Sequence, residues 1–199
     1  MNILNLFPVP VIRQENFLFK EECLEILECI KGVETHKHPA LIGKSESTYD
    51  LTSSIFDFFP NHLKSNIVTR LSENLNLFAN AIGYPNQEIA NSWHNIQFEN
   101  SILKMHTHPT SRISGALYLL VDENSSDITF TNPNAPLVSY AGFKHETPYS
   151  FISYSFKPCV GDLFMFPSWL EHGSNGVLNK SSERIVVSFN SRNQDSGKW

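Results

Sequence analysis

The stretch MHTHPTSRISGALYLL, residues 105–120, places two histidines directly before an apolar run typical of a strand. His106 and His108 are separated by one residue, and side chains two apart on a strand project from the same face, roughly 7 Å apart along the chain. Two imidazoles in this arrangement can bind one metal ion, although imidazole suits iron, zinc, copper and nickel alike. Because an isolated H-x-H pair is more often structural, the stretch predicts a metal site only if the chain supplies further ligands.

Short apolar runs divided by turns continue on both sides of this stretch. We expect strands near residues 92–98, 101–107, 113–121, 127–131, 150–157, 162–167 and 183–191. The fifteen phenylalanines of the chain suit the interior of a β-sandwich. The pattern predicts a mostly β fold with flanking helices, in which an antiparallel double sheet carries the helices outside one face.

Two amphipathic helices are expected before the strands. The first lies within residues 16–32, where Leu24, Leu27 and Ile30 form the apolar face. The second follows Pro60 and carries one apolar stripe, made of Leu63, Ile67, Leu71, Leu75, Phe78 and Ile82.

The rest of the N-terminal half predicts little regular structure. The proline-containing start is expected to be an extended edge segment, and the polar residues 34–54 a loop. We expect one domain over residues 1–199. In it, residues 1–88 supply an edge strand and supporting helices, and residues 89–199 form the β core with its metal site.

The charge and the cysteine content of the chain indicate which binding partners and which cellular compartment to expect. The formal net charge of −5 and the lack of a lysine/arginine block argue against nucleic acid as the main partner. No apolar run reaches membrane-spanning length, and the proline-broken start is not a convincing signal peptide. The three cysteines are an odd number without metal-type spacing, so we expect reduced thiols and a cytoplasmic protein.

A third histidine strengthens the metal-site hypothesis. In GDLFMFPSWLEHGSNGV, residues 161–177, an apolar strand breaks at Pro167 and His172 follows shortly after. A jelly roll brings distant strands together, so a pair of ligands from one strand and a single ligand from another form a natural site. The two-histidine, one-carboxylate centre of non-haem iron oxygenases follows this plan.

Arg184 opens the apolar strand RIVVSFNS, where burial of a charge is costly unless it meets an anion. The planar guanidinium matches a carboxylate in two-pronged fashion. A surface arginine paired with Glu183 is the alternative. Beside three histidines in this order, we expect the anion-binding role.

Three motifs now resemble a known family. H-x-H-P-x-S-x-x-S-G-x-x-Y-L, then G-D-L-x-x-F-P-S-W-L-x-H, then E-R-I-x-x-S-F-N resemble the Fe(II)/2-oxoglutarate-dependent oxygenases known mainly from marine bacteria and their phages. The opening LFPVPV is also similar to that family's N-terminal signature. The resemblance implies a double-stranded β-helix (jelly roll or cupin-like) core, Fe(II) and 2-oxoglutarate as cofactors, and hydroxylation of an unidentified substrate.

The resemblance also implies residue roles. His106 matches the first metal ligand, His172 the distal histidine, and Arg184 the residue that binds the far carboxylate of 2-oxoglutarate. Further contacts with that cosubstrate, or positions lining its pocket, are implied for Tyr118, Ser188, Asn95 and Gln97.

Position 108 departs from the wider superfamily, prolyl hydroxylases included, which has Asp or Glu there. His108 is either a third imidazole ligand, which is our expectation, or it turns aside while water or an outside carboxylate completes the shell. Acidic residues elsewhere lack the H-x-D/E spacing or are expected in solvated turns: Glu99, Asp122, Glu123, Asp127 and Glu171.

Other features are expected to be structural or open to solvent. We expect His36 and His38 to be exposed, His94 to be a core or supporting residue, and His145 to be exposed in the long loop 132–149. Ordinary core positions are expected for Phe130, Phe164, Phe166 and Phe189.

Two rival functions and several partners remain open at this point. The rivals are a cupin-like three-histidine dioxygenase that does not use 2-oxoglutarate, and a non-catalytic jelly-roll binding or virion-associated module. The substrate is expected to be a small molecule or a peptide, with allowance for a homodimer and, if the gene belongs to a phage, for the host cytoplasm.

Overall fold

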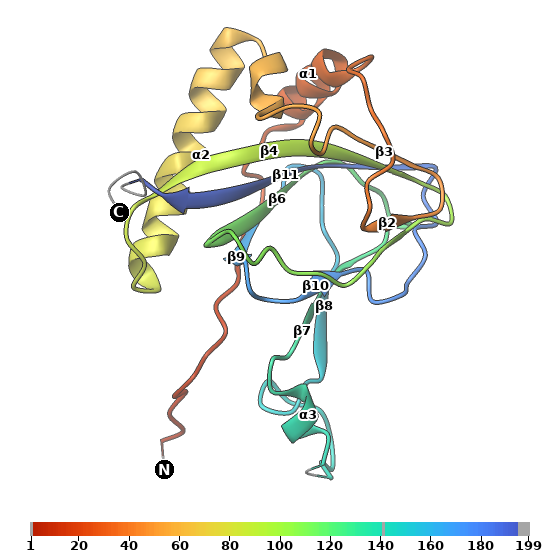
Figure 1. Ribbon diagram of the computed structural model, residues 1–199. Helices are drawn as coiled ribbons and strands as arrows, with labels where there is room; N and C mark the ends of the chain where they lie inside the picture. Colours follow the sequence, from red (N-terminus) through yellow and green to blue (C-terminus); the bar gives the residue numbers. More distant parts are fainter. Residues whose placement is uncertain (1, 141, 195–199) are drawn as a thin grey trace.

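A computed structural model describes residues 2–140 and 142–194 of the chain (Figure 1). Its described residues form a large sheet of six strands, a small sheet of three strands and a two-stranded ribbon, and all strand pairs in them are antiparallel. The order in the large sheet is β1 (Ile12–Gln14), β9 (Leu163–Pro167), β6 (Ile113–Leu120), β11 (Glu183–Asn193), β4 (Gln87–Phe98) and β3 (Ser45–Ser47). The small sheet runs β10 (His172–Gly173), β7 (Ile128–Thr131) and β8 (Ser153–Phe156), and the ribbon pairs β2 (Leu41–Ile42) with β5 (Ile102–Leu103).

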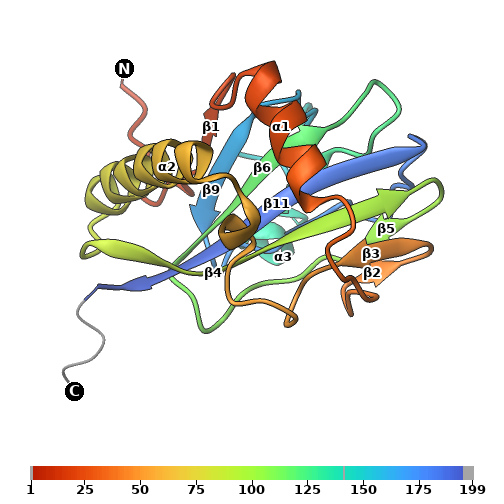
Figure 2. The ribbon, with the colours of Figure 1, turned by 90° about the horizontal axis from the view of Figure 1, so that it is seen from above.

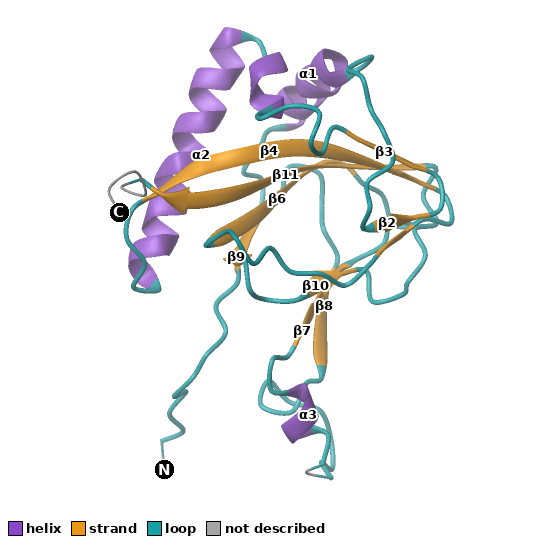
Figure 3. Cartoon of the chain, in the orientation of Figure 1, coloured by secondary structure: helices purple, strands orange, loops and turns teal. Residues whose placement is uncertain are grey.

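The helices cover the outer face of the large sheet, as Figures 1 and 2 show. They are α1 (Lys20–Ile30), the 3-10 helix η1 (Ile55–Phe58) and α2 (Asn61–Ala81). On α2 the predicted apolar stripe is confirmed: Leu63, Ile67, Leu71, Leu75 and Phe78 are buried. The mostly β fold with flanking helices is therefore confirmed (Figure 3).

The buried face of α1 differs from the expected one. Cys23, Ile26 and Ile30 are buried, whereas Leu24 is more than half exposed. The helix docks on the stripe that begins at Cys23, because a free thiol packs as a small apolar side chain. The predicted face shares Ile30 with the observed one but included Leu24 in place of Cys23 and Ile26.

Strand alternation in β11 explains why polar residues lie inside an apolar strand. Ile185, Val187 and Phe189 pack into the core beneath the helices. Arg184 and Ser188 alternate with them and line a cavity on the opposite face of the sheet, between the two sheets. The large sheet thus separates a helix-covered core from the interior in which the site lies.

The structure differs from the sequence prediction in three segments: residues 34–54, 101–107 and 132–149. Within residues 34–54, β2 and β3 form short strands, because β5 and β4 supply partners for their backbones. The strand expected over 101–107 shortens to β5, and a separate bridge joins His106 to His172. Loop 132–149 contains a short helix, α3 (Ala135–Val138).

Among the described residues, no helix has the length and apolar character needed to span a bilayer.

Candidate metal and cosubstrate site

Three histidines from two distant segments meet between the sheets. His106 precedes β6 and pairs with His172 of β10 through two backbone hydrogen bonds of 2.9 and 3.0 Å. The His108 amide donates to the Ser168 carbonyl oxygen at 2.9 Å, which fixes the other end of the H-x-H pair. The ring centroids lie 4.4 Å apart for His106 and His172, 5.0 Å for His106 and His108, and 5.2 Å for His108 and His172.

One ring nitrogen of each histidine lies within 4.8 Å of the others, a distance that a single metal ion can bridge. Among the described residues this is the one cluster of at least three His, Cys, Asp or Glu side chains close enough to hold an ion. No carboxylate belongs to it. Glu171 is exposed, and the Asp122 carboxylate accepts hydrogen bonds from Ser125 in its own turn and from the distant Ser181.

Backbone carbonyls fix the tautomers of two of the histidines. Nδ1 of His106 donates to the Lys104 carbonyl at 2.8 Å, and Nδ1 of His172 donates to the Leu170 carbonyl at 2.9 Å. A carbonyl oxygen can only accept, so each Nδ1 carries the hydrogen and each Nε2 keeps a free lone pair. The His108 ring has no hydrogen-bond partner among the described residues. All three rings therefore suit ligation of a metal such as iron.

Burial keeps these imidazoles neutral, the form that binds metals. Desolvation, followed by the neighbouring His106 and His38, lowers the pKa of His108 to about 4. Desolvation also lowers the pKa of His106, and that of His172 well below its ordinary value of 6.5. A metal ion then meets no competing proton near pH 7.

The buried histidines predict an acid-sensitive apoprotein. His38 and His94 also have pKa values lowered by burial to about 4. Below pH 6.5 the unfolded chain binds more protons than the folded one, so this part of the stability is present above about pH 7 and is lost as the pH falls toward 4. We expect the melting temperature of metal-free protein to fall by roughly 10 °C or more between pH 7.5 and 5 in a thermal-denaturation series. The exposed-histidine control His145→Ala should show the same fall, and a flat profile would contradict the burial of neutral imidazoles.

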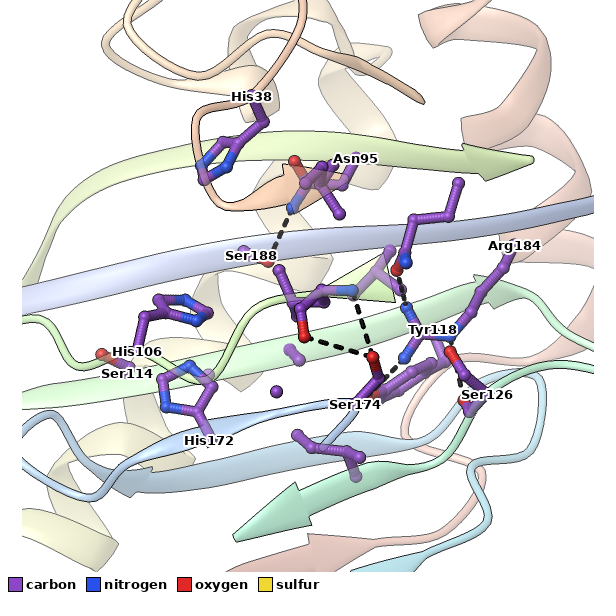
Figure 4. Close-up of a pocket in the computed structure, with 18 of the residues that line it drawn as sticks. His38, Asn95, His106, Ser114, Tyr118, Ser126, His172, Ser174, Arg184 and Ser188 are labelled. Atoms are coloured by element: carbon purple, nitrogen blue, oxygen red, sulfur yellow. Dashed lines mark hydrogen bonds between the residues drawn. The ribbon is translucent and has the colours of Figure 1, made fainter. Parts of the chain in front are cut away.

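Arg184 lies at the other end of the same cavity (Figure 4). Arg184 is 4% exposed, and its guanidinium group forms no ion pair with any described carboxylate. Nε donates to the Ser126 carbonyl at 3.1 Å, one Nη to Gln97 Oε1 at 2.6 Å, and the other Nη to the Tyr118 hydroxyl at 3.4 Å. These are neutral acceptors. Since a buried unpaired charge costs several kcal/mol, the site fits an anionic ligand.

Two further polar groups beside Arg184 lack partners and line the cavity. Gln97 Nε2 and Ser126 Oγ are buried without a hydrogen bond. With the free hydroxyl hydrogen of Tyr118 they are donors suited to a carboxylate, which supports the fit of 2-oxoglutarate. Ser126 was not predicted from the sequence, because a serine in a turn carries no signal of its own.

The other predicted lining residues also reach the cavity. Asn95 and Ser188 lie on neighbouring strands and share a long hydrogen bond of 3.5 Å, while Ser47 donates to Asn95 Oδ1 at 2.8 Å. Next to His172, the ring centroids of Phe166 and Phe130 lie 4.4 and 6.3 Å from that of the imidazole. All eight predicted site residues therefore lie around one cavity.

Of the four outlying histidines, His94 and His145 lie as predicted, whereas His36 and His38 are more buried than expected. The prediction that His38 is exposed is wrong: it is 6% exposed, because its loop folds over the cavity and its ring packs against Tyr49. His36 is half-buried and pairs through its backbone with Ser47. His94 is a core residue, and His145 is exposed in the long loop as expected.

Gly173 lets the two halves of the metal site approach. A Cβ at this position would lie 2.6 Å from the Lys104 carbonyl oxygen and 2.9 Å from that of Leu103. We therefore expect Gly173→Ala to push His172 away from His106 and lower metal affinity about tenfold or more, as measured by competition with a chromogenic chelator. Gly176→Ala is the control: it strains a positive-φ position with open space around it, and should lower stability without lowering metal affinity.

The geometry thus places three imidazoles that could share one metal ion beside a buried arginine without a carboxylate partner, inside a double β-sheet. Residues 91–190, half of the chain, match the family model described as "Putative 2OG-Fe(II) oxygenase". The chain belongs to this family, and it is an Fe(II)- and 2-oxoglutarate-dependent oxygenase with those two cofactors. This membership does not support either alternative function: a cupin-like three-histidine dioxygenase that does not use 2-oxoglutarate, or a non-catalytic jelly-roll binding module. No curated protein sequence matches the chain.

Solved structures of the same fold agree. HygX from Streptomyces hygroscopicus, with nickel and 2-oxoglutarate bound, is similar with a TM-score of 0.62 and 11% identity, over 94% of this chain and 84% of its own. The viral collagen prolyl hydroxylase of Paramecium Bursaria Chlorella virus-1, as a 2-oxoglutarate complex, has a TM-score of 0.58 and 14% identity over 92% and 96%. A Pseudomonas putida prolyl-4-hydroxylase has a TM-score of 0.55 and 12% identity over 94% of each chain. At these identities the likeness confirms the double-stranded β-helix fold.

Proposed function

We propose that the chain hydroxylates its substrate, with His106, His108 and His172 holding Fe(II) and Arg184 binding the distal carboxylate of 2-oxoglutarate. The observation that carries this assignment is a buried guanidinium without a carboxylate partner, in the same cavity as three neutral imidazoles. When bound, Fe(II) and 2-oxoglutarate supply the oxidising chemistry, in which the cosubstrate is decarboxylated to succinate and an oxygen atom is transferred.

The protein's residues orient the cosubstrate and exclude water. Arg184 presents its remaining N–H groups to the carboxylate, and its stacking on the Tyr118 ring, 5.1 Å from the ring centroid, keeps the fork in place. Gln97 and Ser126 have donors to add. Phe130 and Phe166 shield the His172 side of the metal centre from solvent.

His108 gives this centre a different charge from that of a two-histidine, one-carboxylate site. A neutral imidazole in place of a carboxylate leaves the metal centre one unit more positive. The negative charge of the exposed Glu171 raises the pKa of His106 against the larger effect of burial, but Glu171 does not belong to the cluster of possible ligands. We therefore expect anionic ligands, 2-oxoglutarate among them, to contribute much of the charge balance.

The partners and compartment are part of the proposal. The substrate is a small molecule or a peptide, and the exposed apolar side chains of loop 132–149, Leu137, Tyr140, Phe143 and Tyr149, offer a contact surface for it or for a second copy of the chain. The three cysteines are free, which suits a reducing cytoplasm where Fe(II) persists.

Isotope incorporation tests the hydroxylation. Iron-loaded protein is incubated with 2-oxoglutarate, ¹⁸O₂ and a panel of small molecules and peptides, and the products are analysed by mass spectrometry. Hydroxylation predicts one labelled oxygen atom in the product and one succinate per product formed. A product that is desaturated or epimerised without gaining oxygen would refute it.

A further inference from the structure

His38 is a fourth buried histidine at the cavity that holds the three proposed ligands. It lines this cavity together with Trp93, and Figure 4 shows its ring extending from the N-terminal loop toward the side on which His106 and His172 lie. The Trp93 ring neighbours both His38 and His108, with centroid distances of 6.5 and 6.0 Å. The His38 ring nonetheless lies outside the cluster whose nitrogen atoms can share one ion.

The tautomer of His38 is fixed by its own loop. The Ala40 amide donates to His38 Nδ1 at 3.0 Å, so Nδ1 is an acceptor and the hydrogen of the neutral ring is on Nε2. That Nε2–H is buried and has no acceptor among the described residues. A buried donor without a partner is unfavourable, and such groups in a cavity wall are typical of ligand-binding sites.

Trp93 repeats the same feature on the adjoining wall. It is 4% exposed, and its indole Nε1–H is also buried without a partner. Its ring stacks with that of His38 at 6.5 Å between centroids and lies 6.0 Å from the ring of His108. Two orphan N–H donors therefore border the metal centre.

These donors belong to a different end of the cavity from the Arg184 pocket. Trp93 and Gln97 lie on the same face of β4, four residues or roughly 13 Å apart at the usual rise of a strand. Gln97 bonds Arg184, whereas Trp93 adjoins His108. The distal carboxylate of 2-oxoglutarate, held by Arg184, therefore leaves the two donors unused.

We propose that His38 Nε2–H and Trp93 Nε1–H donate hydrogen bonds to an acceptor atom of a ligand held on the open side of the three-histidine metal centre. This inference rests on the proposed function. The acceptor belongs either to the metal-bound end of 2-oxoglutarate or to a separate ligand beside it, and both sources share the chemistry of an oxygen or anionic acceptor. His38 is then a positioning residue that sets how tightly that ligand is bound.

Binding titrations test this role without turnover. The first arm titrates 2-oxoglutarate into anaerobic Fe(II)-loaded protein, and the second titrates azide, a small anionic acceptor, into Co(II)-loaded protein with and without 2-oxoglutarate. Both are followed by visible absorption. The variants are His38→Leu and Trp93→Phe, which remove one N–H each, and His38→Gln, which retains a side-chain N–H donor. His36→Ala, in the same H-x-H pair, is the matched control.

We expect His38→Leu to weaken one of the two ligands about tenfold, Trp93→Phe to weaken the same ligand less, and His38→Gln to restore much of the loss, all with unchanged metal stoichiometry. Loss in the first arm assigns the acceptor to 2-oxoglutarate, and loss in the second to a separate ligand. Unchanged affinities in folded His38→Leu, or loss of the metal itself, overturn this inference alone. Failure of the wild type to bind Fe(II) and Co(II) overturns the proposed function as well.

Discussion

Arg184→Gln is expected to weaken 2-oxoglutarate binding by about 100-fold or more while leaving the affinity for Fe(II) almost unchanged. The loss of one member of a buried, hydrogen-bonded charge pair costs about 3–5 kcal/mol, and each 1.4 kcal/mol is a factor of ten in affinity. Arg184 is buried and its hydrogen-bond partners are neutral. Among the described residues of the cavity wall there is no other lysine or arginine to replace it. Anaerobic titration calorimetry of the metal-loaded protein measures both constants.

The same strand offers a matched control. Arg192 lies eight residues along β11, is largely exposed and pairs with Glu88 at the surface. Arg192→Gln should leave 2-oxoglutarate binding unchanged, because exposed ion pairs contribute little and this one lies outside the cavity. Equal effects of the two substitutions would contradict the assignment of Arg184 as the carboxylate-binding residue.

His108→Ala is expected to lower Fe(II) affinity by at least about 100-fold. Removal of an outer residue that merely orients a ligand costs about 10- to 100-fold, and loss of a ligand should exceed this. The His108 ring has no hydrogen-bond partner among the described residues that would give it another structural task, and it is within reach of both other histidines. Competition with a chromogenic Fe(II) chelator under anaerobic conditions measures the change.

A carboxylate at position 108 distinguishes a role of His108 as a metal ligand from a role in packing. His108→Asp recreates the two-histidine, one-carboxylate set and should retain much more affinity than His108→Ala. His145→Ala, in the exposed loop, should have no effect. If His108→Ala binds iron as the wild type does, His108 turns aside and a ligand from outside the three histidines completes the shell.

Periodicity was enough to predict most of the scaffold. Repeats of three and four residues in α2, and short apolar runs bounded by turns, mark elements whose burial is decided by their own residues. The short strands β2 and β3 were missed because segments of two and three residues become strands only by pairing with β5 and β4 from distant parts of the chain. A pairing of this kind leaves no local trace in sequence.

The candidate site could be predicted from residues with an unusual type and spacing, and its remaining residues, which have no such pattern, were missed. Three histidines and a strand-borne arginine in a fixed order are conspicuous, and the fold brings them to one cavity. Ser126 and His38 are different, since each depends on how a polar loop folds back over the interior. His38 looked like a solvent-exposed residue because its loop is charged, yet the loop packs its ring against Tyr49.

Anaerobic titration of Fe(II)-loaded protein with 2-oxoglutarate tests the central claim most directly. Chelation of the cosubstrate to an iron ion held by the three histidines predicts a visible metal-to-ligand charge-transfer band that saturates at one equivalent of 2-oxoglutarate per protein chain. Arg184→Gln should require much more cosubstrate to reach the same band. A protein that carries one Fe(II) per chain and develops no band at saturating 2-oxoglutarate would contradict the account.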